Sequence, residues 1–555
     1  MEPIYIGIAR RKRAEQLSRI PVEWQLKQLP AESVSDVRGI PRESGILSAR
    51  EIEITETFDA IDLAAKIRSR TYSCYEVAVA FCKRAAIAQQ LLSCLTEIFF
   101  DKALERAKEL DKHLERHGLP LGPLHGVPVS LKDTENVPGY DTSCGMAGLC
   151  FRPATKASAI VLLLEKAGAV LYCKTNIPQT LMALDSHNQI WGRTLNPLNR
   201  RLTPGGSSGG ESALIAMRGS LLGVGSDIGG SIRIPAMCTG VYGIKPTSLR
   251  LASHIGAEGF SIPGSHPIGI SPSVGPLGTS LRSCELLLNL AIDGKLWETE
   301  PHVLFSPWRT IEPKMRQMRF LVLMTDNIVT PLPPVRRLLR ETTALLKYRG
   351  HKVVVLENPP PFLKEHNAIF NRTIGFDGGN HIIDLLDSTE EAKVPCISGR
   401  LARRNPATIQ QLYERYAKKE EFTINCLGLW KSADGEDFDA IIFPVAPHPT
   451  LRHDEWQYAG YTSIFNVLDW PAGAVPARNV TREDLEAPLG IETGDRWDKL
   501  NRTKLWNKKE DYLGTPLSLQ IVGRKMQEEE LVRAMHVVDE VLAETRDATI
   551  RDHKL

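Results

Sequence analysis

Two serines, each set among glycines, mark the stretch of this 555-residue chain that most constrains its fold, residues 205–236. Ser207 stands in the run GGSSGG and Ser231 in the run DIGGSIR, and the apolar, small-residue segment 213–222 joins the two. Glycine is costly in ordered structure and is tolerated where the backbone needs unusual dihedrals or approaches another group closely. We therefore expect two tight loops on either side of a short helix, built as a functional site.

The composition predicts a soluble globular protein without a charged macromolecular partner. The chain carries 68 basic and 66 acidic side chains, for a formal charge of +2, and 42% of its residues are hydrophobic. A nearly neutral chain gives no electrostatic argument for nucleic acid. No apolar run approaches the ~20 residues that a membrane-spanning helix requires, and the N-terminus lacks the features of a secretory signal peptide. We expect neither a nucleic-acid nor a membrane partner.

The ten cysteines and fourteen histidines favour a cytoplasmic protein without a metal. No two cysteines form a Cys-x-x-Cys pair, and many stand in apolar runs, which is typical of reduced core residues. The histidines show no His-Glu-x-x-His or similar ligand spacing, so we predict no metal and no other cofactor. The ending DHKL only loosely resembles a peroxisomal Ser-Lys-Leu signal, and we base no location on it.

Apolar periodicity in the first third of the chain predicts helices at residues 58–70, 73–92, 102–118 and 157–168. Ser73 is placed to cap the second of these helices, with Glu76 three residues further on. Strand-like runs follow at residues 125–134 and 169–174. Before them, residues 1–55 are charged, mixed and interrupted by proline. We predict that residues 1–55 form an N-terminal helical arm that packs on a single catalytic domain, residues 56–555.

Strand and helix patterns alternate along the rest of the chain. We expect further strands at residues 320–325, 352–356, 439–445 and 517–522, and helices at 282–290, 335–348 and 528–545. Residues 243–279 are rich in glycine, proline and serine and are predicted to be mostly loop, whereas residues 360–435 are predicted to be helical, as a lid or side wall. The alternation favours an α/β fold with helices on both faces of a parallel or mixed sheet.

Ser231 is the candidate nucleophile. The two glycines before it permit a turn whose backbone N–H groups converge on one point, as an oxyanion hole for acyl transfer requires. A serine hydroxyl also needs a base, and no histidine stands in a comparably constrained loop. Lys132 ends a strand-like run, and a buried lysine loses its proton more readily because burial disfavours the charged form. Ser207 is the candidate proton relay between Lys132 and Ser231.

Each of these signals has a structural explanation when taken alone. Serine in a glycine-rich turn is usually turn chemistry, and a lysine after a strand usually lies at a solvated edge. A phosphate-binding loop would end in Gly-Lys-Ser or Gly-Lys-Thr, which this stretch lacks. Asp227 and Arg233 are expected to form an ion pair that braces the loop rather than to act directly in catalysis. The joint spacing of the three candidate residues favours a catalytic site.

Residues 205–236 resemble the signature of the amidase family along their full length. The run PVSLKD at residues 128–133 resembles the lysine motif of that family, and the spacing between the two serines is also that of the family. Six further runs are similar to the fungal acetamidase (general amidase) branch, at residues 20–24, 44–47, 80–91, 178–182, 452–454 and 522–524. The resemblance therefore extends over nearly the whole chain.

This resemblance implies an amidase-signature α/β/α sandwich with a large mixed central β-sheet covered by helices, and a Ser–cis-Ser–Lys triad. It makes Ser231 the acylated nucleophile, Ser207 the cis-serine after a cis bond to Gly206, and Lys132 the general base and acid. Backbone N–H groups of the loop, including that of Ser231, would bind the oxyanion. The further residues implied for oxyanion and substrate binding are Ile228, Gly229, Gly230, Leu181 and Met182.

The implied reaction is hydrolysis of a small primary monocarboxylic acid amide to carboxylate and ammonia through an acyl-enzyme. Several segments that face the pocket in the family depart from the acetamidase pattern, at residues 134–138, 144–147, 185–191 and 254–266. An amide with a bulkier aryl, indole-type or secondary-metabolite acyl group is therefore an alternative substrate.

Two hypotheses from other classes stay open. A glutamine-dependent transamidating subunit shares the triad, but it acts with a tRNA-binding partner, and the acetamidase-like runs argue against it. A non-catalytic relative is disfavoured because Lys132, Ser207 and Ser231 are all present. The expected partner is a small-molecule amide substrate, and a homodimer is left open.

Overall fold

A computed structural model of the chain describes residues 2–251, 256–262, 268–311 and 317–552. The described residues form an 11-stranded mixed sheet with the strand order β1-β3-β2-β6-β8-β7-β12-β13-β11-β9-β10. Its strands are β1 Leu95–Ile98, β2 Pro128–Lys132, β3 Val170–Thr175, β6 Leu222–Asp227, β7 Tyr242–Lys245, β8 Ser273–Gly278, β9 Arg319–Leu323, β10 Lys352–Leu356, β11 Ala440–Pro444, β12 Ala472–Asn479 and β13 Pro516–Val522. A separate ribbon pairs β4 His187–Asn188 with β5 Gly192–Arg193.

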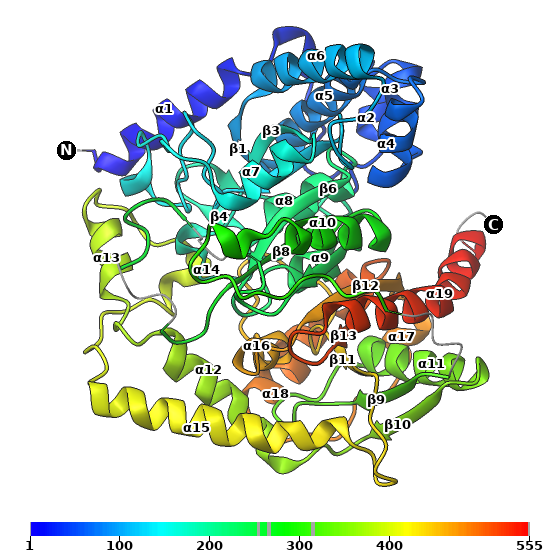
Figure 1. The fold of residues 1–555 in the computed structure, drawn as a ribbon. Coiled ribbons are helices and arrows are strands. Elements are labelled where there is room, and N and C mark those ends of the chain that lie inside the picture. The colour runs from blue at the N-terminus through cyan, green and yellow to red at the C-terminus, as the bar shows by residue number, and fades with distance from the viewer. Residues whose placement is uncertain (1, 252–255, 263–267, 312–316, 553–555) are drawn as a thin grey trace.

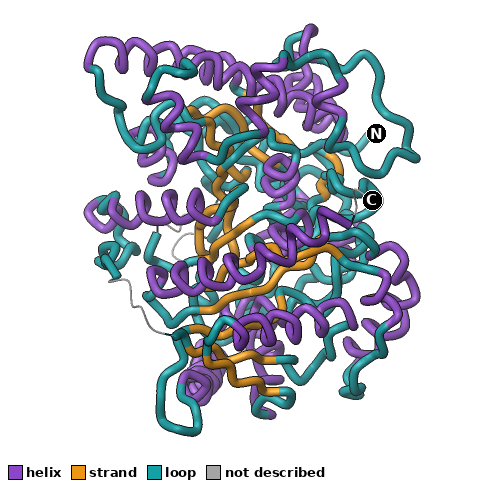
Figure 2. Tube along the Cα trace, turned by 90° about the vertical axis from the view of Figure 1, so that its right-hand side faces the viewer, coloured by secondary structure: helices purple, strands orange, loops and turns teal. Residues whose placement is uncertain are grey.

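The large sheet contains two groups of parallel strands separated by an antiparallel centre. Strand β2 runs parallel to β3 and β6, and β9 runs parallel to β10 and β11, whereas β8, β7, β12 and β13 form an antiparallel centre. Helices cover both sides of the sheet, and in Figure 2 the orange strands run through the middle of the molecule with purple helices on either side. The predicted α/β/α sandwich around a mixed sheet is therefore confirmed.

The helices follow the chain around this sheet, as Figure 1 shows. They are α1 Ile4–Ser18, α2 Ile40–Glu43, α3 Ala49–Glu56, α4 Ala60–Arg68, α5 Cys74–Leu92, α6 Phe100–His117, α7 Ala159–Lys166, α8 Gly209–Ala216, α9 Arg233–Thr239, α10 Leu281–Asp293, α11 Pro333–Tyr348, α12 His366–Ile374, α13 Asn380–Asp387, α14 Pro395–Ser398, α15 Ile409–Leu427, α16 Gly460–Val467, α17 Arg482–Glu486, α18 Arg496–Leu500 and α19 Glu528–Asp552. Ser73 and Glu76 form the predicted capping box at the start of α5.

The prediction that residues 243–279 are mostly loop was wrong for two strands. Strands β7 and β8 lie next to each other in the middle of the large sheet, where β8 also pairs with β6. The glycines of these strands weaken the strand pattern in the sequence. Close packing requires glycine here, because a Cβ on Gly275 would clash with the carbonyl oxygen of Ile244. The expected short helix between the serine loops is also only part of the connection, since β6 follows α8.

Helices α1, α2 and α3 occupy about half of residues 4–56, so the predicted arm is partly helical. Its division from a domain at residues 56–555 stays a prediction. Residues 553–555 of the C-terminal ending, and residues 254–255 and 263–266 of the segment that departs from the acetamidase pattern, lie outside the described residues.

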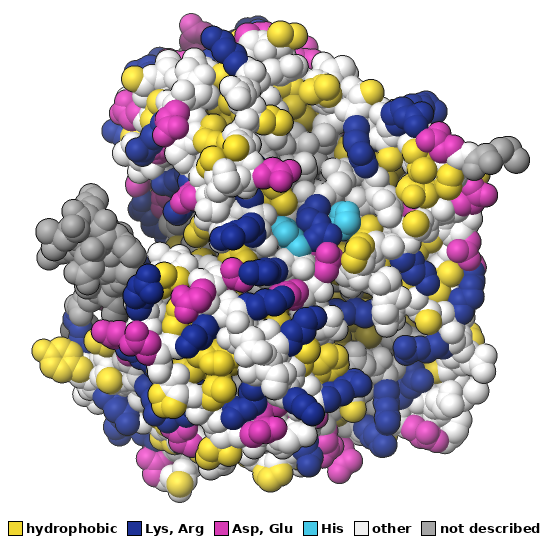
Figure 3. Space-filling model, turned by 180° about the vertical axis from the view of Figure 1, so that it is seen from behind, with side chains coloured by type: hydrophobic (Ala, Val, Ile, Leu, Met, Phe, Trp, Pro, Cys, Tyr) yellow, Lys and Arg dark blue, Asp and Glu magenta, His cyan; other side chains and the backbone are white. Residues whose placement is uncertain are grey.

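The described helices include none that is both long and apolar enough to cross a membrane. On the face shown in Figure 3, lysine and arginine side chains gather across the middle and lower part, with acidic side chains between them. Charges of both signs therefore share this face.

Candidate active site

Lys132 is the last residue of β2, between the parallel strands β3 and β6, and its side chain is fully buried. Its Nζ donates hydrogen bonds to Ser207 Oγ at 2.7 Å, to Ser226 Oγ at 2.9 Å and to the Ser226 carbonyl oxygen at 3.1 Å. All three acceptors are uncharged. Burial lowers the pKa of Lys132 to about 7, although Asp227 and Glu135 act in the opposite direction. A lysine with such a pKa can accept and donate a proton near neutral pH.

Ser207 stands just before α8, and the peptide bond between Gly206 and Ser207 is cis, as the resemblance predicts. Gly206 packs tightly against a neighbouring loop. A Cβ on this residue would lie 2.7 Å from the Asp185 nitrogen and 2.8 Å from the Ala183 carbonyl oxygen. Because both are backbone atoms, they cannot swing aside as the end of a side chain can, and this position requires glycine.

An ion pair braces the loop that carries Ser231. Arg233 donates through Nη2 to Asp227 Oδ1 at 2.8 Å and through Nε to Asp227 Oδ2 at 3.0 Å, and both side chains are fully buried. The same carboxylate accepts hydrogen bonds from the backbone N–H groups of Gly230, at 2.7 Å, and Ile232, at 3.1 Å. Burial by itself raises the pKa of Asp227, but Arg233 and its other polar neighbours outweigh it and hold this pKa below its usual value. The predicted bracing pair is confirmed.

Three backbone N–H groups around the nucleophile candidate have no acceptor among the described residues, those of Ile228, Gly229 and Ser231. Gly229 and Ser231 are buried and Ile228 is half-buried. Roughly nine in ten buried backbone N–H groups in folded proteins are paired, so a group of unpaired ones indicates a place for an acceptor from a ligand. The N–H of Gly230 differs because it donates to Asp227. The Asp227 carboxylate therefore competes with the predicted oxyanion for the Gly230 N–H.

The two serine loops lie side by side because the N–H of Ser208 donates to the carbonyl oxygen of Ser231 at 3.2 Å. Ser207 and Ser231 are 3% and 5% exposed, and Lys132 lies against the first of them. The structure thus brings the three catalytic candidates into one buried region. Within the described residues, the hydrogen bonds join Lys132 to Ser207 but do not join Ser207 to Ser231.

Leu181 and Met182, predicted to contact substrate, differ in their surroundings. Leu181 ends the short helix η3 (Gln179–Leu181) and packs against an apolar group that we call the Cys144 cluster, formed by buried Cys144, Met146, Leu149 and Leu386. Ser143, the residue before Cys144, donates to the carboxylate of Asp133, the residue after Lys132, so the Cys144 cluster lies near the end of the strand that carries the candidate base. Met182 is 43% exposed. Of these two residues, Leu181 is the one that packs on the cluster.

Two residues of the site were missed by sequence reasoning. Ser226 supplies two acceptors to Lys132, and its place on β6, directly before Asp227 in the glycine-rich stretch, was an available signal. Phe370 lies on α12, far along the chain, and its ring packs over the serine loop, because a Cβ on Gly229 would lie 2.8 Å from Phe370 Cζ. No pattern around Phe370 in the sequence indicates this contact.

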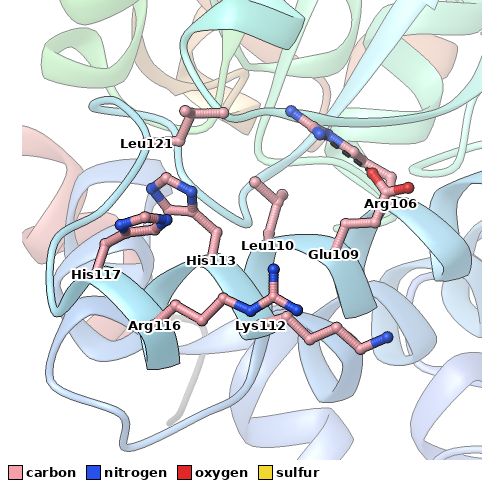
Figure 4. A pocket seen from close by; sticks show the side chains of 8 residues that line it. All are labelled: Arg106, Glu109, Leu110, Lys112, His113, Arg116, His117 and Leu121. Carbon is pink, nitrogen blue, oxygen red and sulfur yellow. Dashed lines mark hydrogen bonds and ion pairs between the residues drawn. The ribbon is translucent and has the colours of Figure 1, made fainter.

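A hollow on the outer face of α6 is separate from this region (Figure 4). It is lined by Arg106, Glu109, Leu110, Lys112, His113, Arg116, His117 and Leu121, most of them exposed and none a predicted site residue. Elsewhere in the described parts of the chain, no group of three or more His, Cys, Asp or Glu side chains is arranged to hold a metal ion.

Comparisons with known proteins place this chain in a family. The family model described as Amidase matches residues 76–532. The acetamidase of Emericella nidulans is 35% identical over 546 residues, which cover 96% of this chain and 97% of that protein. The acetamidase of Aspergillus oryzae is also 35% identical, over 550 residues that cover 96% of this chain and 98% of that protein.

Solved structures give the same answer for the fold. The structure of a fatty acid amide hydrolase is similar with a TM-score of 0.87 at 28% identity, and the match covers 97% of this chain and 96% of that one. A bacterial aryl acylamidase is similar with a TM-score of 0.69 at 19% identity, with 87% and 96% covered, which supports the fold alone. Since the family model covers most of the chain and the curated relatives align over almost their full length, this chain belongs to the amidase family.

Proposed function

We propose that this chain hydrolyses a small primary amide of a monocarboxylic acid to the carboxylate and ammonia. The observation that carries the proposal is Lys132, a fully buried lysine whose hydrogen-bond acceptors are all uncharged and include Ser207. Beside it lies Ser231, in a loop with unpaired backbone N–H groups. The acetamidase names of two relatives at 35% identity support a small acyl group.

In the proposed acylation step, Ser231 Oγ attacks the amide carbonyl carbon. Its proton passes to Ser207 Oγ while the Ser207 proton passes to neutral Lys132, so that no charge is left on either hydroxyl. The carbonyl oxygen becomes an oxyanion that the N–H groups of Ile228, Gly229 and Ser231 stabilise. The C–N bond then breaks, and the proton held by Lys132 returns through Ser207 to the leaving nitrogen. Ammonia departs and Ser231 carries the acyl ester.

Deacylation uses the same groups in the same order. A water molecule gives a proton through Ser207 to Lys132 as its oxygen attacks the ester carbonyl carbon. When the C–O bond to Ser231 breaks, this proton returns to Ser231 Oγ, and the carboxylic acid leaves and ionises. Each step needs Lys132 to be neutral at its start, which a pKa of about 7 permits near neutral pH.

A bulkier, apolar acyl group is the second candidate substrate, and the Cys144 cluster favours it. Leu181 and Phe260 pack against this cluster, which consists of apolar side chains and the Cys144 thiol and lies near the end of β2. Phe370 adds an aromatic ring over Gly229. Apolar walls next to a reacting carbonyl favour amides with aryl or longer alkyl acyl groups, because burying each CH₂ contributes about 0.8 kcal/mol.

Ammonia release from a panel of primary amides tests the proposed function. The panel runs from acetamide through butyramide to aryl and indole acetamides, with glutamine as a separate arm, and Ser231→Ala serves as the matched control. We expect turnover by the wild-type chain and none by Ser231→Ala, and the chain length that gives the highest kcat/KM distinguishes the two acyl groups. Equal turnover by Ser231→Ala would rule out the assigned nucleophile, and release from glutamine alone would support the transamidating class.

The proposed location is the cytoplasm. All ten cysteines are free thiols, and nine of them are buried. Reduced, buried cysteines are typical of proteins that work in a reducing compartment. Fractionation of the expressing cells tests this part of the proposal, and recovery of the protein with secreted or organellar material would contradict it.

A further inference from the structure

The inner face of the N-terminal helix α1 packs on the body of the protein. Tyr5 and Ile8 pack against a small apolar cluster that includes Ala147 and Trp191. One turn further along, Lys12 is 3% exposed, and its aliphatic stem is buried with its charge. Figure 1 shows α1 in dark blue beside β1. The helix therefore inserts a lysine into the body instead of presenting it to solvent.

Lys12 lies between two buried carboxylates that come from different segments. Its Nζ donates to Asp141 Oδ2 at 2.9 Å and also to Glu97 Oε1, and these carboxylates are 4% and 3% exposed. Burial by itself lowers the pKa of Lys12, but the two carboxylates outweigh it and hold this pKa above its usual value. Lys12 is therefore charged at any pH at which the enzyme works, and it ties Asp141 to the helix.

Asp141 is the first residue of a loop. Buried charged side chains contact this loop at three successive residues, 141, 142 and 143. Lys174 Nζ donates to the Asp141 carbonyl oxygen at 2.6 Å and to Thr142 Oγ1 at 2.8 Å. The next residue, Ser143, donates through its N–H and its hydroxyl to Asp133, which directly follows Lys132 in sequence. Because Cys144 follows Ser143 and Asp133 follows Lys132, these contacts set where the Cys144 cluster stands relative to the end of β2.

The same helix holds two other segments around the site. Arg13 donates to the carbonyl oxygen of Gln189 at 2.7 Å, and the N–H of Tyr5 donates to the carbonyl oxygen of Thr389 at 3.0 Å. Two residues after Thr389, Glu391 accepts hydrogen bonds from the Ala147 N–H and from the Gln179 side chain, at 2.6 and 2.7 Å. Helix α1 thus touches segments of the chain that converge on the Cys144 cluster and η3.

We propose that Lys12 is a positioning residue for the amide substrate. By anchoring Asp141, it fixes the loop of residues 141–146, and so the apolar wall against which the acyl group of the substrate packs. Helix α1 then sets the affinity for substrate, while Lys132, Ser207 and Ser231 keep their own contacts. This inference rests on the proposed amide hydrolysis.

Three variants separate positioning from simple loss of stability. Lys12→Met keeps the length of the side chain but leaves the Asp141 carboxylate without its cation, while its hydrogen bond from the Phe151 N–H at 2.6 Å remains. Lys12→Met/Asp141→Asn also removes that orphaned charge, so it is expected to fold where the single variant does not, and Glu97 keeps its ion pair with Arg19 at 2.7 Å. The matched control is Lys83→Met, which breaks an ion pair of 2.7 Å with Glu51 between α5 and α3, away from the loop.

The measurement is KM and kcat per active site, with active sites counted by labelling of Ser231 with a fluorophosphonate. We expect a roughly tenfold rise in KM for the Lys12→Met/Asp141→Asn variant, largest for the bulkiest amide, with kcat within about twofold of wild type. Lys83→Met is expected to keep the wild-type KM. Lys12→Arg, which retains the charge, should recover most of the lost affinity.

Two outcomes would overturn the inference. An unchanged KM with fewer active sites would show that Lys12 only stabilises the fold, and an equal rise in KM in Lys83→Met would show that any loosening of the N-terminal region suffices. A wild-type chain that hydrolyses no amide on the panel would instead contradict the proposed function itself, so the two failures are distinguishable.

Discussion

Two fully buried lysines stand on neighbouring parallel strands of the sheet, Lys132 on β2 and Lys174 on β3. Lys174 Nζ lies 2.7 Å from Asp133 Oδ1, so its charge is compensated by a carboxylate. The Nζ of Lys132 instead meets the hydroxyl of Ser207 and two oxygens of Ser226. The two side chains share residue type, burial and strand environment, and they differ in whether a carboxylate is among the groups that contact the Nζ atom.

This difference distinguishes Lys174, a lysine that stabilises the fold, from Lys132, a lysine that can exchange a proton. A carboxylate in direct contact stabilises the ammonium form, and together the two charges form a buried pair that is costly to break. Neutral oxygens do not offset the loss of hydration, so burial lowers the pKa of Lys132 to about 7. The partner of a buried lysine therefore decides whether it holds the fold or exchanges a proton.

The largest effect on activity is expected for substitution of Lys132, the proposed base. We expect Lys132→Met to lower kcat/KM by about a thousandfold or more, because it removes the only general base and acid of the proposed cycle. The measurement is ammonia release per folded molecule, with Ser231→Ala as a second null variant. A Lys132→Met enzyme that kept a tenth of the wild-type rate would contradict the assignment of Lys132 as the base.

Substitution of Lys174 is expected to lower the stability of the fold. Lys174→Met leaves the Asp133 carboxylate buried without its cation and should lower the free energy of unfolding by about 3–5 kcal/mol. Lys132→Met should cost much less, because it replaces an uncompensated buried amine by an apolar side chain. Urea denaturation of the two variants measures the difference, and Lys174→Met/Asp133→Asn should regain part of the loss. Equal losses for the two lysines would contradict the distinction between them.

A smaller effect is expected when one of the uncharged hydrogen-bond acceptors of Lys132 is removed. Ser226→Ala removes one hydrogen bond that stabilises the protonated form of Lys132, so the pKa of Lys132 should fall further below its usual value. A net hydrogen bond of about 1 kcal/mol corresponds to a shift of roughly half to one pH unit in the midpoint of the kcat profile. The profile is measured between pH 5 and 9, a range in which the assay must be calibrated for free ammonia. A midpoint that moves upward would contradict this direction.

Local patterns in the sequence predicted those parts of the molecule that depend on neighbouring residues. The bounds of β10 were predicted exactly as found, and the strand-helix-strand unit of β9, α11 and β10 is parallel, as the alternation indicated. The capping box of α5 is likewise a contact between residues three apart. The bracing pair of Asp227 and Arg233 also lies within one loop.

Other parts could not be read locally, because they depend on residues that meet only after folding. The centre of the sheet was taken for loop, since close packing there requires the glycines that weaken a strand pattern, as Gly275 shows. Phe370 reaches the serine loop, and Lys12 reaches Asp141, from distant segments, and the motif says nothing of either contact. The competition of Asp227 for the Gly230 N–H depends on the path of one turn, which the residue types alone do not determine.

The central claim is that Lys132 is a base with a pKa near neutrality, and the pH dependence of Ser231 acylation tests it most directly. The rate at which a fluorophosphonate labels Ser231 is measured from pH 5 to 10 in the wild-type chain and in Lys132→Met. We expect the wild-type rate to rise with pH as Lys132 loses its proton, with a midpoint at about pH 7, and to level off above it. In Lys132→Met the rate should be low and should lack this step. A midpoint near the ordinary lysine pKa of about 10, or the same profile in both proteins, would contradict the claim.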